Sequence, residues 1–296
     1  MSVNRAQAVA LLLIVAPVLF VAPGLIACAE QSVVQDAVML SRAGEDGKAI
    51  ALLQGYLQRH PSAISERRLL LRIHAQGGNL QAAQADAVDL ARTLGDQSPV
   101  PWLELGYALE LTHRYDEALQ MYDKAAAVAP RDPAGPRVGG MRAAHWGEMG
   151  WAADRLTEAL RRDSRAADVW HALGVVELTR GNLDQAQRAY ESGLVADPAS
   201  AENHLGLASV AALQGKYAQA LQHYDAIAAL RPHLASVQLG RSWMLIQLGR
   251  AEEARRALAA AQALGADPRV VRAQLNALQG GLSNPSPNAQ KPLENR

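Results

Sequence analysis

The stretch Trp102–Gly106 reads WLELG, and it returns as WHALG at Trp170–Gly174, two periods of about 34 residues further on. The residues that follow keep the same spacing: Ala118, Tyr122 and Pro130 after the first stretch, Ala186, Tyr190 and Pro198 after the second, and Ala220, Tyr224 and Pro232 one period later. A period of this length is typical of proteins built from stacked units, in which each unit covers the apolar face of its neighbour. The chain is therefore expected to be a one-dimensional stack of helical pairs.

The small and special residues of the pattern have expected places in each unit. Gly106 and Gly174 should lie where the first helix meets the second, because only a minimal side chain lets the two axes approach. Tyrosines should fill the space between neighbouring units: Tyr122, Tyr190 and Tyr224. Glycines should end the first helices with a left-handed backbone: Gly181, Gly215 and Gly249. Prolines should stop the second helices: Pro130, Pro198 and Pro232.

This order of aromatic residue, Leu-Gly, small residue, second aromatic residue and proline, together with its period, resembles the tetratricopeptide repeat (TPR). The resemblance implies an all-α fold, a right-handed superhelix of about seven helix-turn-helix repeats with a C-terminal capping helix. The array is expected to span 28–282 as one elongated domain. Its repeats are phased as 30–63, 64–98, 99–132, 133–166, 167–200, 201–234 and 235–268, followed by a cap at 269–281. The polar, proline-containing tail 283–296 is expected to be disordered.

Composition agrees with closely packed helices. Apolar residues make up 49% of the chain but aromatic residues only 4%, so the interior must consist mainly of alanine and leucine. No segment alternates for long with the period of two that marks a strand. The formal net charge is zero, and removal of the segment 1–27 takes away one arginine, Arg5, and leaves −1. Nucleic acid is not expected as a partner, because proteins that bind it usually carry a basic stripe.

The segment 1–27 has the order of a signal peptide. Arg5 precedes Ala8–Ala29, which carries no charge and ends in small residues. The single cysteine, Cys28, ends the stretch LIAC, which resembles the bacterial lipobox. That resemblance implies that Cys28 is lipidated and becomes the first residue of the mature protein. Cleavage before Glu30 and an uncleaved transmembrane anchor remain as alternatives, since ~20 apolar residues can span a bilayer.

All three alternatives place the repeats outside the cytoplasm. Ala29 rather than aspartate follows the cysteine. By resemblance to lipoprotein sorting, this implies the outer membrane of a two-membrane bacterium, with the repeats facing the periplasm. A soluble periplasmic protein and an inner-membrane anchor are the alternatives.

No pattern of catalytic or cofactor-binding residues stands out. The eight histidines form neither an H-E-x-x-H motif nor a Cys/His zinc spacing, and no G-x-S-x-G motif is present. Acidic pairs such as Glu252-Glu253 stand at the starts of second helices, where the helix dipole favours negative charge. We therefore expect no enzyme activity, no cofactor, no metal and no small-molecule substrate.

The resemblance to TPR proteins implies that the first helices line a concave groove for a peptide or a partner helix. The corresponding positions of this chain are Arg68, Arg72, Leu103, Tyr107, Glu110, Arg137, Met141, His145, His171, Val175, Leu205, Leu239 and Trp243. Tyr107 and Trp243 are the favoured anchors, because aromatic residues recur as binding hot spots. For Trp243, packing between the sixth and seventh repeats is the competing interpretation. The groove is basic at its start and apolar at its end, which predicts a partner segment that is acidic at one end and amphipathic at the other.

Together these features predict a non-catalytic scaffold for protein–protein interaction, an outer-membrane TPR lipoprotein that assists assembly of an envelope machine of the secretin or pilus type. One repeat has a weaker resemblance to the TadD lipoproteins of Tad/Flp pilus assembly, carried by Leu173-Gly174-Val175, Gly181, Ala186, Tyr190 and Gly193-Leu194. The alternatives are an adaptor that docks periplasmic enzymes such as proteases or cell-wall hydrolases, and a structural oligomer that stacks through its end repeats.

Overall fold

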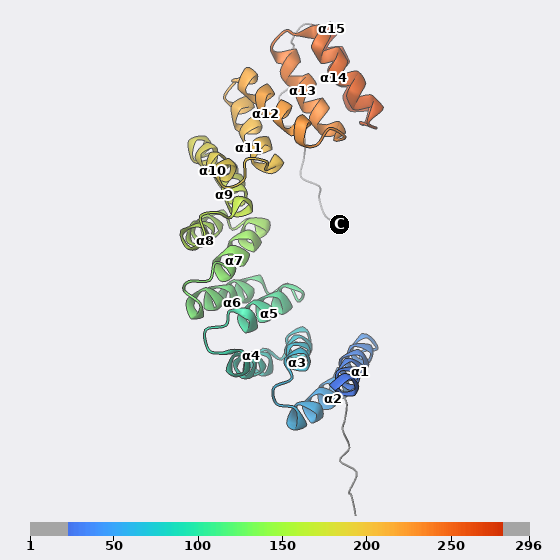
Figure 1. The fold of residues 1–296 in the computed structure, drawn as a ribbon, viewed down its shortest axis with the longest axis vertical. Helices are drawn as coiled ribbons and strands as arrows, with labels where there is room; N and C mark the ends of the chain where they lie inside the picture. The colour runs from blue at the N-terminus through green and yellow to red at the C-terminus, as the bar shows by residue number, and fades with distance from the viewer. Residues whose placement is uncertain (1–22, 281–296) are drawn as a thin grey trace, which may run out of the picture. The chain divides into compact units, whose positions relative to one another are not determined.

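The computed structural model describes the backbone of residues 23–280 and the side chains of residues 33–280. Over this range it contains fifteen α-helices and no strand (Figure 1). The expected all-α architecture is confirmed. Most of the predicted signal peptide 1–27 and the whole tail 283–296 lie outside the described residues. Among the described helices, none has both the length and the apolar character needed to cross a membrane.

The first fourteen helices form seven pairs. They are α1 (Pro23–Arg42) with α2 (Asp46–Arg59), α3 (Ile64–Gln76) with α4 (Leu80–Leu94), α5 (Val100–Glu110) with α6 (Tyr115–Val128), α7 (Ala134–Trp146) with α8 (Met149–Arg162), α9 (Ala167–Thr179) with α10 (Leu183–Ala196), α11 (Ala201–Leu213) with α12 (Tyr217–Leu230), and α13 (Ala235–Gln247) with α14 (Ala251–Ala263). The last helix, α15 (Pro268–Gln279), packs on α13 and α14. Each pair falls within one of the expected repeat ranges, except that α1 begins earlier and includes Cys28.

The described chain divides into two compact units, one up to Asp86 and one from Ala87 on, with the division inside α4. In the first unit, α1, α2 and α3 share a core that includes Ala37, Leu53 and Ile73. In the second unit, each second helix packs on its own first helix and on the first helix of the next pair, from α6 on α7 to α12 on α13. The stacking expected from the period is present within this unit.

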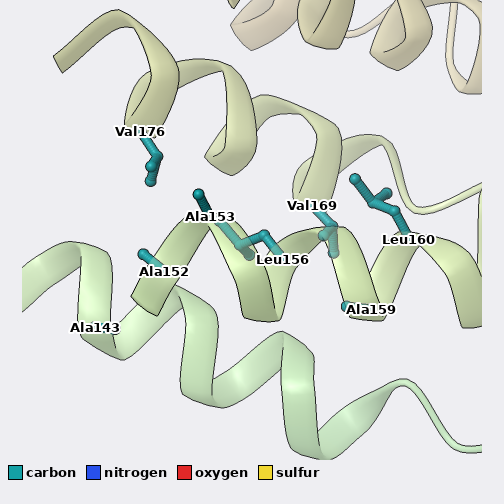
Figure 2. Close-up of a cluster of buried hydrophobic side chains, with 8 residues drawn as sticks. All are labelled: Ala143, Ala152, Ala153, Leu156, Ala159, Leu160, Val169 and Val176. Carbon is teal, nitrogen blue, oxygen red and sulfur yellow. The ribbon is translucent and has the colours of Figure 1, made fainter. Parts of the chain in front are cut away.

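The core around α8 shows how alanine and leucine build this interior. Figure 2 shows Val169 and Val176 of α9 pointing toward the alanines and leucines of α8. Ala152 and Leu156 of α8 are fully buried, as is Ala143 of α7 on the other side of the same helix. Small side chains at these positions let the axes of three helices come close together. The space between the helices is thereby filled to the density typical of protein interiors.

The same turn joins the two helices of each pair. In the fifth pair, Gly181 has a φ of +82°, and the Asn182 N–H donates to the Glu177 carbonyl oxygen at 2.9 Å. Glycine has no steric penalty in this left-handed conformation. Positive φ values recur at the corresponding glycines: Gly44, Gly78, Gly147, Gly215 and Gly249. The expectation for Gly181, Gly215 and Gly249 is confirmed.

One turn has no glycine. His113 occupies the corresponding place between α5 and α6 with a φ of +59°. A left-handed backbone costs a non-glycine residue roughly 1–2 kcal/mol. The His113 ring is held by a 2.8 Å hydrogen bond between its Nδ1 and the Tyr115 hydroxyl. The backbone of this turn therefore has a conformation that histidine disfavours.

Glycines of two successive first helices enclose the buried tyrosines. An added Cβ at Gly174, in the same pair, would lie 2.4 Å from the Tyr190 ring, and so would one at Gly206 in the next pair. The Tyr122 ring lies in the same way against Gly106, and an added Cβ at Gly139 in the next pair would lie 3.0 Å from the Tyr122 Cβ. The expectation that these tyrosines fill the space between units is confirmed, since Tyr122 and Tyr190 are almost completely buried.

A cross-repeat contact closes the end of α6. Arg162, at the end of α8, donates from one guanidinium nitrogen to the carbonyl oxygens of Ala126, Ala129 and Asp132 at 3.2, 3.0 and 2.8 Å. These include carbonyl groups that the end of a helix leaves without intrahelical donors. Burial lowers the pKa of Arg162, and Asp132 opposes that shift. A single side chain thus ties the fourth pair to the third.

Candidate protein-binding groove

A groove of about 910 Å³ lies among α11, α12, α13 and α15 in the second unit. Its apolar lining residues include Leu205 from α11, Tyr224 and Ile227 from α12, Val237, Leu239 and Trp243 from α13, and Val270 and Ala273 from α15. The structure thus brings together three of the residues predicted from the sequence, Leu205, Leu239 and Trp243. They come from first helices of consecutive pairs, as the groove interpretation requires.

Ion pairs stand at the polar edges of this groove. Arg231 donates to Glu202 at 2.7 Å, and Arg269 donates to Asp267 at 3.0 Å. A hydrogen bond from its own backbone N–H, together with Arg231, holds the pKa of Glu202 below its usual value. The Arg269 guanidinium lowers the pKa of Asp267 in the same way. An apolar centre with a charged rim is the common anatomy of a protein interface.

Trp243 has two roles in the structure. It lines the groove, and it also packs, partly buried, against a core that includes Ala211, Leu221 and Met244. The two interpretations of this tryptophan are therefore not exclusive. Leu205 differs, because it is 46% exposed. It packs neither in the core that Trp243 contacts nor in the core that Leu239 contacts.

Tyr107 and Glu110 on α5 are engaged within the protein. The Arg142 guanidinium lies 5.3 Å from the centroid of the Tyr107 ring, and the Tyr122 ring meets that ring edge-on at 6.0 Å. Glu110 accepts a hydrogen bond from the Tyr122 hydroxyl and pairs with Arg142 at 3.1 Å. Burial raises the pKa of Tyr122, and the hydrogen bond to Glu110 raises it further. Glu110 thus stabilises the contact between the third and fourth pairs, while Tyr107 keeps an exposed face.

The remaining predicted residues of the second unit lie outside the groove of α11–α15. Arg137 pairs with Asp168 of the next first helix, which offsets the basic charge that the sequence suggested there. Met141 packs on the core around α8, and Leu103 is half-buried. His145 and Val175 are exposed. The His171 ring lies 5.9 Å from that of Tyr190, and burial lowers the pKa of His171 although Glu202 and Asp168 oppose this.

Arg68 and Arg72 belong to α3 in the first unit. Arg72 is exposed, and its Nε donates to the Arg68 carbonyl oxygen at 3.4 Å. They do not line the groove of the second unit.

Sequence reasoning missed the part of the groove that second helices and the cap supply. Tyr224 and Ile227 come from α12, and Val270, Ala273 and Gln274 come from α15. The apolar face of the final helix was the available signal, but only its role as a cover was inferred from it. Within residues 33–280, no group of three or more His, Cys, Asp or Glu side chains is arranged to hold a metal ion.

Two family models, both for the tetratricopeptide repeat, match this chain. One matches residues 152–186 and 171–235, and the other matches residues 211–276. Neither indicates a catalytic family. Among curated proteins, cellulose synthase operon protein C of Komagataeibacter xylinus is 29% identical over 111 residues, which are 37% of this chain and 8% of that protein. The match therefore covers less than a tenth of that relative's length.

Solved structures share the fold. The C-terminal part of a TPR repeat-containing protein of Cytophaga hutchinsonii aligns with a TM-score of 0.60 at 13% identity, and the alignment covers 81% of this chain and 98% of that solved part. YrrB, a TPR protein with an unusual peptide-binding site, aligns at 0.54 and 17% identity, covering 64% and 97%. PilF of Pseudomonas aeruginosa aligns at 0.53 and 17% identity, covering 84% and 99%. With the paired helices, these likenesses show that the chain has the tetratricopeptide repeat fold, and the family models match tetratricopeptide repeats within residues 152–276.

Proposed function

We propose that this protein is a non-catalytic scaffold that binds a short segment of a partner protein in the groove among α11, α12, α13 and α15. The observation that carries the proposal is the joint exposure of Leu205, Leu239 and Trp243 to one apolar groove with a charged rim. Aromatic side chains at the centre of such a surface commonly supply most of the binding energy. The ion pairs at the rim would affect the association rate and the salt dependence more than the affinity.

The partner segment is expected to be mainly apolar. Arg137, one of the predicted groove residues, and Arg142 already pair with Asp168 and Glu110. Their charges are therefore partly neutralised by carboxylates of the same chain. The sequence suggested an acidic end of the partner segment. Such an end would gain less binding free energy from these arginines than an apolar end would gain in the groove.

The first test compares two leucines of α11. Leu205→Glu places a charge in the groove, whereas Leu213→Glu places the same charge on a leucine that is similarly exposed, at 49%, and does not line the groove. Peptides selected from a random library on the wild-type protein should bind Leu213→Glu unchanged and Leu205→Glu about 10–100-fold more weakly, equivalent to roughly 1.4–2.8 kcal/mol. Fluorescence anisotropy with the selected peptides measures both.

Melting curves of the same variants control for folding. Trp243→Ala should weaken binding and also lower the melting temperature, because this side chain contacts both groove and core. Equal affinity of wild type and Leu205→Glu for every selected peptide would place the binding site elsewhere.

We further propose that the scaffold is a lipoprotein of the bacterial outer membrane, anchored through Cys28 and facing the periplasm, where it assists assembly of a secretin or pilus-type machine. The support is the uncharged stretch Ala8–Ala29 that ends in LIAC and the small residue after the cysteine. Cleavage before Cys28 would remove Pro23–Ala27 from α1 and leave the rest of the helix to begin at the anchor. The first repeat would then lie close to the membrane surface.

The anchor has its own test. Cells fed a radioactive or clickable palmitate should label the wild-type protein, and Cys28→Ser should lose the label completely. The variant should accumulate as precursor or as a soluble form cut before Glu30. Identical labelling and membrane fractionation of the two proteins would refute lipidation at Cys28 and leave the groove proposal untouched.

A further inference from the structure

Two histidines face each other across one helical pair. His204 of α11 and His223 of α12 have their Nδ1 atoms 3.2 Å apart. Their ring centroids are 5.5 Å apart, and the ring planes differ by 44°. Both side chains are half-buried, so neighbouring atoms restrict their rotation. Neither histidine lines the groove of the proposed function.

A small polar pocket of about 170 Å³ adjoins this pair. Its lining residues include Gln187 and Glu191 from α10, Gln214 from α11, and Gln219, Gln222 and His223 from α12. The Gln187 Nε2 donates to the Glu191 carboxylate at 2.7 Å. Burial lowers the pKa of His223, as does His204, while Glu191 opposes the shift. Glu191 and His223 thus line the same pocket.

The separation of the two nitrogens suits one metal ion. Imidazole nitrogens bind zinc at about 2.0–2.1 Å, so two of them on one tetrahedral ion lie roughly 3.3–3.4 Å apart. The observed 3.2 Å is close to this separation, and metal binding would turn the two rings until both Nδ1 lone pairs point at one ion. In the metal-free pair one Nδ1 carries the proton of the hydrogen bond. Binding would move that proton to Nε2 of the same ring, so that both Nδ1 lone pairs face the metal.

We propose that His204 and His223 form a two-histidine site for a divalent transition metal such as Zn²⁺, Ni²⁺ or Cu²⁺. Water completes the coordination shell, since no third ligand within residues 33–280 is arranged for it. Glu191 supplies a nearby negative charge in the adjoining pocket. Such a site exchanges its metal readily, and binding strength should follow the usual order with Cu²⁺ tightest. The ion would fasten α11 to α12, the helices that carry Leu205 and Tyr224 into the groove.

The test uses the full chain and the metal ions themselves. Isothermal titration at neutral pH should give one site per chain for Cu²⁺, Ni²⁺ and Zn²⁺, and the melting temperature should rise with metal concentration, as for any ligand that binds only the folded state. His204→Gln and His223→Gln should each weaken binding by at least tenfold, because even loss of an outer-shell partner commonly costs about 10–100-fold. His171→Gln, which changes another half-buried histidine of a neighbouring pair, should leave binding unchanged.

A measurement on the wild-type protein covers the case in which a variant fails to fold. On addition of Zn²⁺, the imidazole nitrogen resonances of two histidines should shift as expected for coordination through Nδ1. Absence of a site near one equivalent overturns the proposal. Binding that survives both glutamine variants, or shifts confined to other histidines, overturns it as well. None of these outcomes depends on peptide binding in the groove.

Discussion

Replacing Gly135 with alanine is expected to lower the free energy of unfolding by about 3 kcal/mol, the upper end of the usual cost of overpacking. Gly135 lies in the first turn of α7, where it meets α6. An added Cβ would lie 2.5 Å from the Ala126 nitrogen and 2.7 Å from its Cα. These are backbone atoms, so no change of rotamer relieves the overlap. The third and fourth pairs would have to separate, which also strains the contacts of Arg162 with the end of α6.

Gly150→Ala is the matched control. Gly150 is also near the start of its helix, α8, and an added Cβ there meets nothing within 4 Å. Alanine is favoured over glycine in a helix by up to ~1 kcal/mol, so this variant should be neutral or slightly more stable. Urea unfolding followed by circular dichroism compares the two variants with wild type. Equal stability of both variants would show that α6 and α7 can move apart at little cost.

Tyr190→Ala is expected to cost about 3–5 kcal/mol, as for other large aromatic side chains removed from a core. Tyr190 is 1% exposed and belongs to a core with Ala186, Leu207 and Val210. The glycines at 174 and 206 have no side chain to fill the resulting space. A whole protein is commonly stable by only ~5–15 kcal/mol, so the array should lose a large part of its stability. Tyr190→Phe should cost much less, because the ring fills the space between the glycines.

A double-mutant cycle tests the packing directly. Gly206→Ala should destabilise the wild type, since the new methyl group would lie 2.4 Å from the Tyr190 ring. In the Tyr190→Ala background the same change should be neutral or stabilising, because the ring is gone and alanine favours the helix. The two changes should therefore be strongly non-additive, which is the mark of residues in contact. Additive effects in urea unfolding would mean that Gly206 and Tyr190 do not share this space.

The candidate site could be predicted from the sequence only in part. The period of the repeats placed Leu205, Leu239 and Trp243 on first helices, and the structure brings these three into one groove. The same rule also selected Glu110 and Arg137, which pair with Arg142 and Asp168 of neighbouring helices. The rule gives the face of a helix on which a residue lies. It does not give the partner that the next repeat presents, because that depends on side-chain contacts between helices.

The sequence by itself determined the helical pairs, the left-handed turn at Gly181 and the placement of Tyr190 between units. These depend on local backbone preference and on the regular spacing of the repeats, both of which can be read along the chain. Only the tertiary structure decided that α15 supplies a wall of the groove, that Arg162 ties α8 to the end of α6, and that His204 meets His223. Each of these contacts brings a side chain of one helix against another part of the chain, and no periodic signal specifies such a contact. The physical reason is that packing between helices is set by the shapes and charges of both surfaces together.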